Sequence, residues 1–416
     1  MASKMANMNK RQPLTLDEIF FVIVMGIGLN PNVAGFEMSK SISYCFYAIW
    51  VCLAFYKASN ERLVCDYGIK PLGVRIAAPK IAMVVYSLLL SALGLSDSGL
   101  VGGLNQIASF VVPIAAVYLF GSKTIDLIFY SCIISTAFVI PFTVFFYGPE
   151  CLIAPFRAVF DSRASNPFET SQFTFTASYL CVYYSCLDKN RRPGKIIASL
   201  FMCFIGFKRI VLVALMFVML LNFILIRVAP QSKESIVARS LICIGLGCFA
   251  YISLLYSGFI EDLMSTSSIN VMGRNYYWQV AVDNSAFNLF YLGQGVNSLQ
   301  KLLTTYYSYL HVGGVHCDIL KMYYELGFIG FALWLYYYLG YIPSWLKRRN
   351  AHQTLVAYGL VTMFQFVLFF TDNVDTYLGS QLVYCSIPMI IWIDECRRSC
   401  QSSGRYPDNL RLNRFV

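Results

Sequence analysis

Long hydrophobic runs, each bounded by a short polar or charged segment, follow one another along the whole chain. A helix that crosses a bilayer needs about 20 mostly apolar residues, and a window of that length finds about twelve such runs. The predicted helices lie at 19–35, 41–56, 81–95, 100–120, 125–147, 171–187, 196–207, 210–226, 240–260, 319–342, 354–370 and 382–393. The pattern predicts an all-α, polytopic transmembrane protein with about 12 spans.

The composition supports a membrane protein. Hydrophobic residues make up 57% of the 416 positions and charged residues only 13%, whereas a soluble domain has about a quarter charged residues. Lipid must therefore be the solvent for much of the surface. No linker separates two soluble parts, so we expect residues 1–416 to form a single integral membrane domain.

Lysine and arginine set the predicted orientation, because inside loops carry an excess of both. With the N-terminus inside, the inside loops hold basic groups such as 189–195 and 347–349, and both termini lie inside. The outside loops have few basic residues: Lys40, Arg157, Arg163, Lys208, Arg209, Arg274 and Lys301. The formal charge of +10 is thus spread over many short runs, which argues against nucleic acid as a partner.

Two outside segments are long, at 148–170 and 261–317. The larger one is rich in aromatic residues, and its stretch Asn275–Leu292 is predicted to form an amphipathic helix at the membrane interface. Cys151 and Cys317 fall in these two loops. They could form a disulfide, but most cysteines here lie in apolar runs, and we favour two free thiols.

Ionisable residues near the membrane are costly and are therefore candidates for function. Lys208 and Arg209 lie between two predicted spans on the side that otherwise avoids positive charge. They form either a short turn with side chains directed to the interface or an anion site. Gly273-Arg274, just before the predicted interfacial helix, offers another cation for an anion.

The strongest candidate is the segment in which His316 and Asp318 enter the next predicted span. Asp318, Lys321 and Glu325 follow at helical spacing and share one face. One interpretation is a helix start with Asp318 near the dipole and Lys321 paired with Glu325. That interpretation does not explain His316, whose side chain is suited to proton exchange near neutral pH.

The last outside loop carries Asp372-Asn373-Val374-Asp375. Two carboxylates could bind a divalent cation, but no set of oxygen ligands accompanies them at the spacing of a metal site. We therefore interpret this segment as a solvated turn and predict neither a metal nor a cofactor.

These features resemble the O-antigen polymerase and O-antigen ligase superfamily of bacterial envelope glycosyltransferases. That family has an Arg opening a span, a Gly-Arg followed by Trp in a large periplasmic loop, and His-Asn-x-x-Leu leading to Glu-x-Gly-x-x-Gly. The matching residues are Lys208-Arg209; Gly273-Arg274 with Trp278; and His316 to Leu320 with Glu325, Gly327 and Gly330. Lys208 replaces the usual Ser or Thr, and Cys317 the usual Asn. The first half of the chain agrees only in hydropathy and topology.

The resemblance implies a metal-independent glycosyltransferase in the bacterial inner membrane, with cytoplasmic termini and a site facing the periplasm. Donor and acceptor would be glycans linked to undecaprenyl diphosphate. Arg274, Arg209 and Lys208 would bind the diphosphate, and His316 would be the general base, with Glu325 or Asp318 orienting or replacing it. Other implied partners are membrane lipid, a chain-length regulator and a flippase.

Three functions remain open at this point. A polymerase would join lipid-linked repeat units, whereas a ligase would transfer finished glycan to lipid A-core. We favour the polymerase, because Gly-Arg-x-x-x-Trp and Glu-x-Gly-Phe-Ile-Gly look closer to that branch. A transporter or flippase should show two similar halves, and the sequence shows none.

Overall fold

A computed structural model describes residues 13–29, 32–33, 36–37, 40–60, 69–96, 100–161, 166–267, 274–307 and 314–402. Apart from the paired two-residue strands β1 (Asn32–Val33) and β2 (Phe36–Glu37), this part is built of helices and their connections, which confirms the all-α class. The helices are α2 (Leu16–Leu29), α3 (Lys40–Asn60), α4 (Ile69–Ala92), α5 (Leu100–Phe120), α6 (Thr124–Tyr147), α7 (Ala154–Phe160), α8 (Ser171–Val182), α9 (Pro193–Ile205), α10 (Arg209–Arg227), α11 (Pro230–Tyr256), α12 (Phe259–Ser267), α13 (Arg274–Asp283), α14 (Ser298–Tyr306), α15 (Asp318–Tyr336), α16 (Ile342–Arg348), α17 (His352–Phe369) and α18 (Leu378–Ser402).

Each predicted span overlaps a helix, but the span predicted over 19–35 runs past the end of α2 at Leu29 and into β1. Two other helices begin well before the apolar run that predicted them. Helix α4 begins at Ile69 and α11 at Pro230, so charged residues lie inside both. Side-chain partners accommodate the added charges of α4: the Arg75 guanidinium lies 4.0 Å from the Trp345 ring centre, and Lys80 is paired with Asp375. Hydropathy alone cannot reveal such partners.

The prediction of one helix over Asn275–Leu292 is wrong in its extent. Helix α13 ends at Asp283, because Asn284 and Ser285 follow and their side chains bond back to the carbonyl oxygens of Val280 and Ala281. Such side chains compete with helix continuation. The next helix of this loop, α14, begins only at Ser298.

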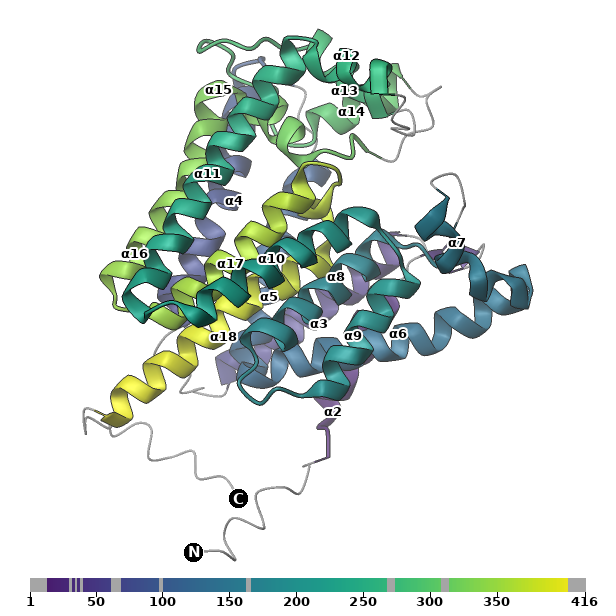
Figure 1. The fold of residues 1–416 in the computed structure, drawn as a ribbon, viewed down its shortest axis with the longest axis vertical. Coiled ribbons are helices and arrows are strands. Elements are labelled where there is room, and N and C mark those ends of the chain that lie inside the picture. Colours follow the sequence, from purple (N-terminus) through teal and green to yellow (C-terminus); the bar gives the residue numbers. More distant parts are fainter. Residues whose placement is uncertain are drawn as a thin grey trace, which may run out of the picture.

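The helix ends form two polar groups at opposite ends of the bundle. Figure 1 shows α12, α13 and α14 together at one end, while α2 begins and α18 ends at the other. Ion pairs at that other end link predicted inside segments, as in Lys123 with Glu18, Arg192 with Asp126, and His352 with Glu234. These three ion pairs therefore join segments that the charge pattern predicts to lie on the same side.

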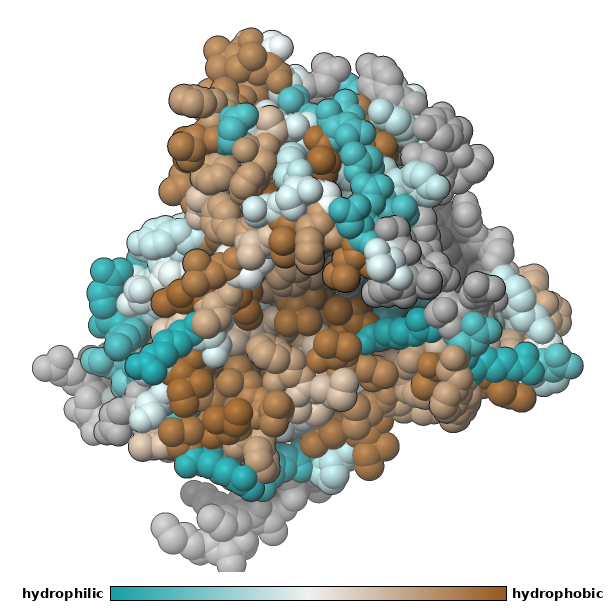
Figure 2. Space-filling model, turned by 45° about the horizontal axis from the view of Figure 1, so that its top comes forward, coloured by the Kyte–Doolittle hydropathy of each residue, from teal (hydrophilic) through white to brown (hydrophobic). Residues whose placement is uncertain are grey.

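Six candidate membrane spans occur in the described part of the chain: Pro71–Ala92, Gly102–Tyr147, Arg209–Arg227, Ser232–Tyr256, Asp318–Arg348 and His352–Phe369. The segment Gly102–Tyr147 includes both α5 and α6. Figure 2 shows a broad hydrophobic area over the middle of the visible face, with hydrophilic residues mainly toward its margins. Helices thus suited to a membrane are present, while the total of about 12 spans and their orientation stay predictions.

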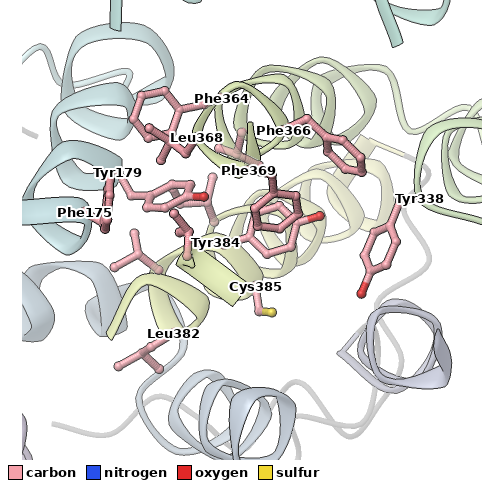
Figure 3. Close-up of a cluster of buried hydrophobic side chains, with 14 of the residues drawn as sticks. Phe175, Tyr179, Tyr338, Phe364, Phe366, Leu368, Phe369, Leu382, Tyr384 and Cys385 are labelled. Atoms are coloured by element: carbon pink, nitrogen blue, oxygen red, sulfur yellow. The ribbon is translucent and has the colours of Figure 1, made fainter. Parts of the chain in front are cut away.

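The best-packed part of the core joins α8, α17 and α18. Tyr179 of α8 lies against Phe364 of α17, with ring centres 4.9 Å apart, and its hydroxyl donates to Gln365 Oε1 at 2.7 Å. Tyr384 of α18 lies in the same cluster (Figure 3). Because aromatic packing of this kind leaves little freedom, it fixes the turn that connects α17 to α18.

Candidate functional site

The turn between α17 and α18 gathers side chains from distant parts of the sequence around Asp372. Lys208 Nζ, at the start of α10, lies 2.9 Å from Asp372 Oδ2 and 3.1 Å from Glu169 Oε1. His316 Nδ1, just before α15, lies 3.6 Å from Asp372 Oδ1. Three segments that are separate in the sequence therefore meet at one carboxylate.

The interpretation of residues 372–375 as a solvated turn is wrong. Asp372 is 1% exposed and Asp375 is 3% exposed. Asp375 is paired with Lys80 of α4 and accepts a hydrogen bond from Gln106 of α5 at 2.9 Å. Both carboxylates are buried because cations or amides from other helices compensate them.

The pKa values of the central pair follow from this pairing. Burial by itself would raise the pKa of Asp372, but Lys208 and His316 outweigh that effect and hold the pKa well below its usual range. Burial would likewise lower the pKa of Lys208, but the carboxylates of Asp372 and Glu169 outweigh it and raise the pKa. Both groups are therefore charged at neutral pH.

Arg274 reaches the same turn from the first residue of α13. Its Nη1 donates to the carbonyl oxygen of Thr371 at 3.0 Å. One helical turn later, the buried Trp278 donates from Nε1 to Val315 O at 3.1 Å, which fixes α13 beside His316. Gly273 lies outside the described residues.

Arg209 follows Lys208 but is directed elsewhere. Its Nη2 donates to Ala158 O of α7 at 3.2 Å, and the residue is exposed. The structure thus brings Lys208, Arg274 and His316 to the 371–372 turn, whereas Arg209 lies at its margin.

His316 has an unusual backbone conformation. Its φ of 51° lies in the left-handed region, which costs roughly 1–3 kcal/mol for a residue with a side chain. The next residue, Cys317, caps α15 by accepting a hydrogen bond from Leu320 N on Sγ at 3.5 Å. Cys317 and Cys151 are both free thiols, as predicted. The turn directs the half-buried His316 ring away from the helix and toward Asp372.

Asp318 and Glu325 hold backbone segments, and no hydrogen bond or ion pair joins either of them to His316 in the described part of the chain. Asp318 Oδ2 accepts from Asp375 N at 2.7 Å, and Glu325 Oε1 accepts from Asn297 N at 2.9 Å. No ion pair joins Lys321 to Glu325 within the described residues. A role for Asp318 or Glu325 in proton transfer stays a prediction.

The Glu-x-Gly segment breaks α15 instead of continuing it. Gly327 has a φ of 71°, and a Cβ there would lie 2.2 Å from Tyr291 O. The loop segment 291–295 enters this break: Phe328 N donates to Tyr291 O at 2.9 Å, and Gly295 N donates to Glu325 O at 2.9 Å. The large loop that is predicted to lie outside is therefore fastened to α15 by backbone hydrogen bonds.

A polar cavity of about 550 Å³ borders the turn. Its lining includes Lys321, Glu169 and several amide and hydroxyl side chains, among them Asn105, Gln172, Gln300, Asn373 and Thr376. The sequence reasoning did not find this cavity, and it interpreted Asp372 as part of a solvated turn. An aspartate next to an apolar run was a visible signal for Asp372, but no spacing pattern points to the cavity.

A larger cavity, of about 1220 Å³, lies at the opposite end of the same helices and is lined by residues such as Lys189, Arg192 and His352. None of the predicted site residues lines it. Size alone does not make it the functional site, because many of its charges are already paired with one another.

Comparison with known proteins agrees with the predicted resemblance. Residues 195–335 match the model of the O-antigen ligase family. This segment runs from α9 to α15 and contains Lys208, Arg209, Arg274, His316 and Glu325. The segment is a family domain consistent with the O-antigen polymerase and ligase superfamily. A search of curated proteins finds no match to the chain.

Proposed function

We propose that the protein is a polysaccharide polymerase that joins undecaprenyl-diphosphate-linked oligosaccharide repeat units at the outer face of the bacterial inner membrane. The observation that carries the proposal is the meeting of Arg274, Lys208 and His316 at Thr371–Asp372. An anion-binding cation and a proton acceptor are the two groups that transfer from a lipid diphosphate requires.

The arginines are the diphosphate-binding groups of this proposal. Arg274 uses Nη1 on Thr371 O and keeps other guanidinium donors for phosphate oxygens. Arg209, exposed beside Lys208, would add a second cation. Lys208 is already compensated by Asp372 and Glu169, so we assign it to holding Asp372 in place. The donor needs no metal in this scheme, because the arginines neutralise the diphosphate.

His316 is the general base. Its Nε2 would accept the proton of an acceptor hydroxyl while that oxygen bonds to the donor's anomeric carbon. The bond from that carbon to the diphosphate oxygen breaks, and undecaprenyl diphosphate leaves with the electron pair. Asp372, close to Nδ1, would orient the ring and stabilise the imidazolium that forms. Asp372 thus takes the role expected of Glu325 or Asp318.

A ligase that transfers lipid-linked glycan to lipid A-core is the second candidate, because the matching family model is described as O-antigen ligase. The same residues would serve both reactions, which differ in the acceptor. We favour the polymerase because the Gly-Arg-x-x-x-Trp and Glu-x-Gly-Phe-Ile-Gly segments resemble that branch more.

The deciding experiment supplies purified protein with undecaprenyl-diphosphate repeat units alone. A ladder of products without lipid A-core supports the polymerase, whereas transfer only from added polymer onto core identifies the ligase. His316→Ala and Arg274→Ala should each lower the rate by about 10²- to 10⁴-fold. Arg157→Ala, an exposed arginine of α7, is the matched control. Normal ladders from His316→Ala would refute the assigned base.

A further inference from the structure

The polar cavity beside Asn373 has a composition that differs sharply from the cationic side of the same turn. Thr371 and Asp372 contact Arg274, Lys208 and His316, whereas Asn373 lines the cavity. The turn therefore has a cationic side and a side with many amides and hydroxyls, and Glu169, which lines the cavity and is paired with Lys208, lies where the two sides meet.

We infer that this cavity is a glycan subsite that binds an uncharged oligosaccharide portion of the lipid-linked substrate. The inference rests on the proposed function and adds the chemical class that this part of the site accepts. The volume of about 550 Å³ falls within the about 300–1,000 Å³ usual for small-molecule sites, which leaves room for a short oligosaccharide.

Three amides around the cavity have unused hydrogen-bonding capacity. Asn373 Oδ1 is buried without a partner in the described part of the chain, and its residue is 8% exposed. The side chains of Asn105 and Gln300 form no hydrogen bond to any described residue. A buried amide oxygen without a partner costs about 1–3 kcal/mol, and a bound hydroxyl would satisfy it. Amides both donate and accept, as sugar hydroxyls do.

The protein holds these amides in place with close backbone contacts. Gly314 lies between two of them: a Cβ there would lie 2.2 Å from Asn373 Nδ2 and 3.5 Å from Gln300 Oε1. Asn297, also in the lining, adopts the left-handed conformation with a φ of 67° and is held by Glu325. The wall is thus prearranged, which lowers the entropic cost of binding.

The charges of the lining disfavour an acidic sugar. Glu169 and Lys321 are the two charged side chains of the lining, and their formal charges cancel. The surroundings of Lys321 add the carboxyl groups of Glu325, Asp318 and Asp375, with Lys80 paired to Asp375. Near Glu169, the cation Lys208 is matched by the carboxylate of Asp372. A carboxylated sugar would meet no net positive charge here, so burying it would not be compensated.

The test measures binding of the repeat-unit oligosaccharide, released from its lipid and diphosphate, to the full-length protein in lipid nanodiscs by calorimetry. Asn105→Leu and Gln300→Leu should each weaken binding about 5-fold or more, which corresponds to one lost hydrogen bond. Gln279→Leu, an exposed amide of α13 that is bonded to Asp283, is the matched control and should bind normally. Inorganic diphosphate should not displace the oligosaccharide.

A second probe tests the charge preference. The same oligosaccharide with its primary hydroxyls oxidised to carboxylates should bind at least 10-fold more weakly. Equal binding of both forms, no binding to the wild type at millimolar concentration, or unchanged binding by Asn105→Leu and Gln300→Leu would overturn the subsite. If those variants bind normally while ladders form, the subsite alone is wrong. If binding depends on both amides but no ladder forms, the polymerase proposal alone is wrong.

Discussion

His316 combines a strained backbone with a side chain that the proposed reaction needs. A non-glycine residue at a φ of 51° is usually retained only where the surrounding structure enforces it. Here Cys317 begins the next helix at once, so the turn has no room to relax. The backbone strain at His316 results from placing its imidazole beside Asp372 directly before the N-terminus of α15.

Glycine and alanine at position 316 should separate strain from chemistry. Both variants lack the imidazole and should lose activity to the same extent. The free energy of unfolding of His316→Gly should exceed that of His316→Ala by about 1 kcal/mol, because glycine adopts the left-handed region without a steric cost. His316→Gly should therefore unfold at a higher temperature. Thermal unfolding in detergent measures the difference. Equal stability of the two variants would show that the turn is unstrained.

The pair of Lys208 and Asp372 should behave as a buried ion pair. Lys208→Met and Asp372→Asn should each cost about 3 kcal/mol of stability, because each removes the nearest oppositely charged partner of a buried charge. Glu169 still faces Lys208, and His316 still faces Asp372. The double variant should cost less than the sum of the two. The exposed pair of Lys57 and Asp17 is the control, and Asp17→Asn should cost less than about 1 kcal/mol.

The pH dependence of unfolding provides an independent check on the same pair. Because the pKa of Asp372 is lowered in the folded protein, its contribution to stability is present above the unfolded pKa of about 3.9 and is lost as the pH falls toward the folded value. Wild-type protein should therefore lose more stability between pH 6 and pH 3 than Asp372→Asn. An identical acid response in both would contradict the pairing.

At the same scale, the sequence indicated the cations and the histidine of the site but not the group that joins them. Lys208, Arg274 and His316 stand out because charge is scarce in outside segments. Asp372 is visible beside an apolar run, but it was interpreted as part of a solvated turn, because nothing in the sequence shows that Lys208 approaches it from 164 positions away. Pairing across that separation depends on how α10 and α17 pack.

At the level of elements, α15 shows how one glycine organises the outside loop. Two close backbone approaches meet at its break: a Cβ on Gly327 would lie 2.2 Å from Tyr291 O, and a Cβ on Gly293 would lie 2.4 Å from Gly327 N. The break leaves backbone N–H and C=O groups of α15 without helical partners, and the loop supplies hydrogen bonds to them. The helix and the loop are therefore one structural unit.

Gly327→Ala should destabilise the protein by about 3 kcal/mol, combining the cost of a left-handed alanine with that of overpacking. Gly247→Ala provides the control, since Gly247 lies in α11 with open space around its Cα. It should stabilise the protein slightly, by about 0.5–1 kcal/mol, as expected for alanine in a helix. Thermal unfolding of both variants tests the contrast, and a Gly327→Ala variant as stable as wild type would refute it.

Hydropathy predicted the positions of the helices because each apolar run is long. It did not predict where most of the helices end. The predicted limits of 100–120 agree with α5, whose ends coincide with the ends of its apolar run. Helix α4 extends past its apolar run because Trp345 and Asp375 compensate its charges. Helix α13 stops early because side chains compete for its last carbonyl oxygens. These tertiary and local contacts leave no trace in hydropathy.

On the scale of the whole molecule, helices α8, α17 and α18 connect two chemically distinct ends. At one end they border the amide-lined cavity and the Asp372 turn; at the other they border the larger charged cavity. Between these ends lies the aromatic cluster of Figure 3, and six segments of the described residues are long and apolar enough to cross a membrane. The proposed reaction takes place at the outer face of the membrane. It therefore requires that the end with Asp372 and His316 lies on that side.

Cysteine labelling can determine which end faces outside. Gln279→Cys in α13 should react with a membrane-impermeant maleimide in spheroplasts, whereas Lys189→Cys, at the opposite end, should react only after lysis. Both positions are exposed, so accessibility to water is matched. Wild-type protein gives the background, to which the exposed cysteines of the described residues, Cys45, Cys52 and Cys243, should add little because they lie on helices predicted to cross the membrane. Reversed labelling would place His316 on the inside and exclude a periplasmic reaction. Labelling of both variants in intact spheroplasts would contradict the separation of the two ends by a membrane.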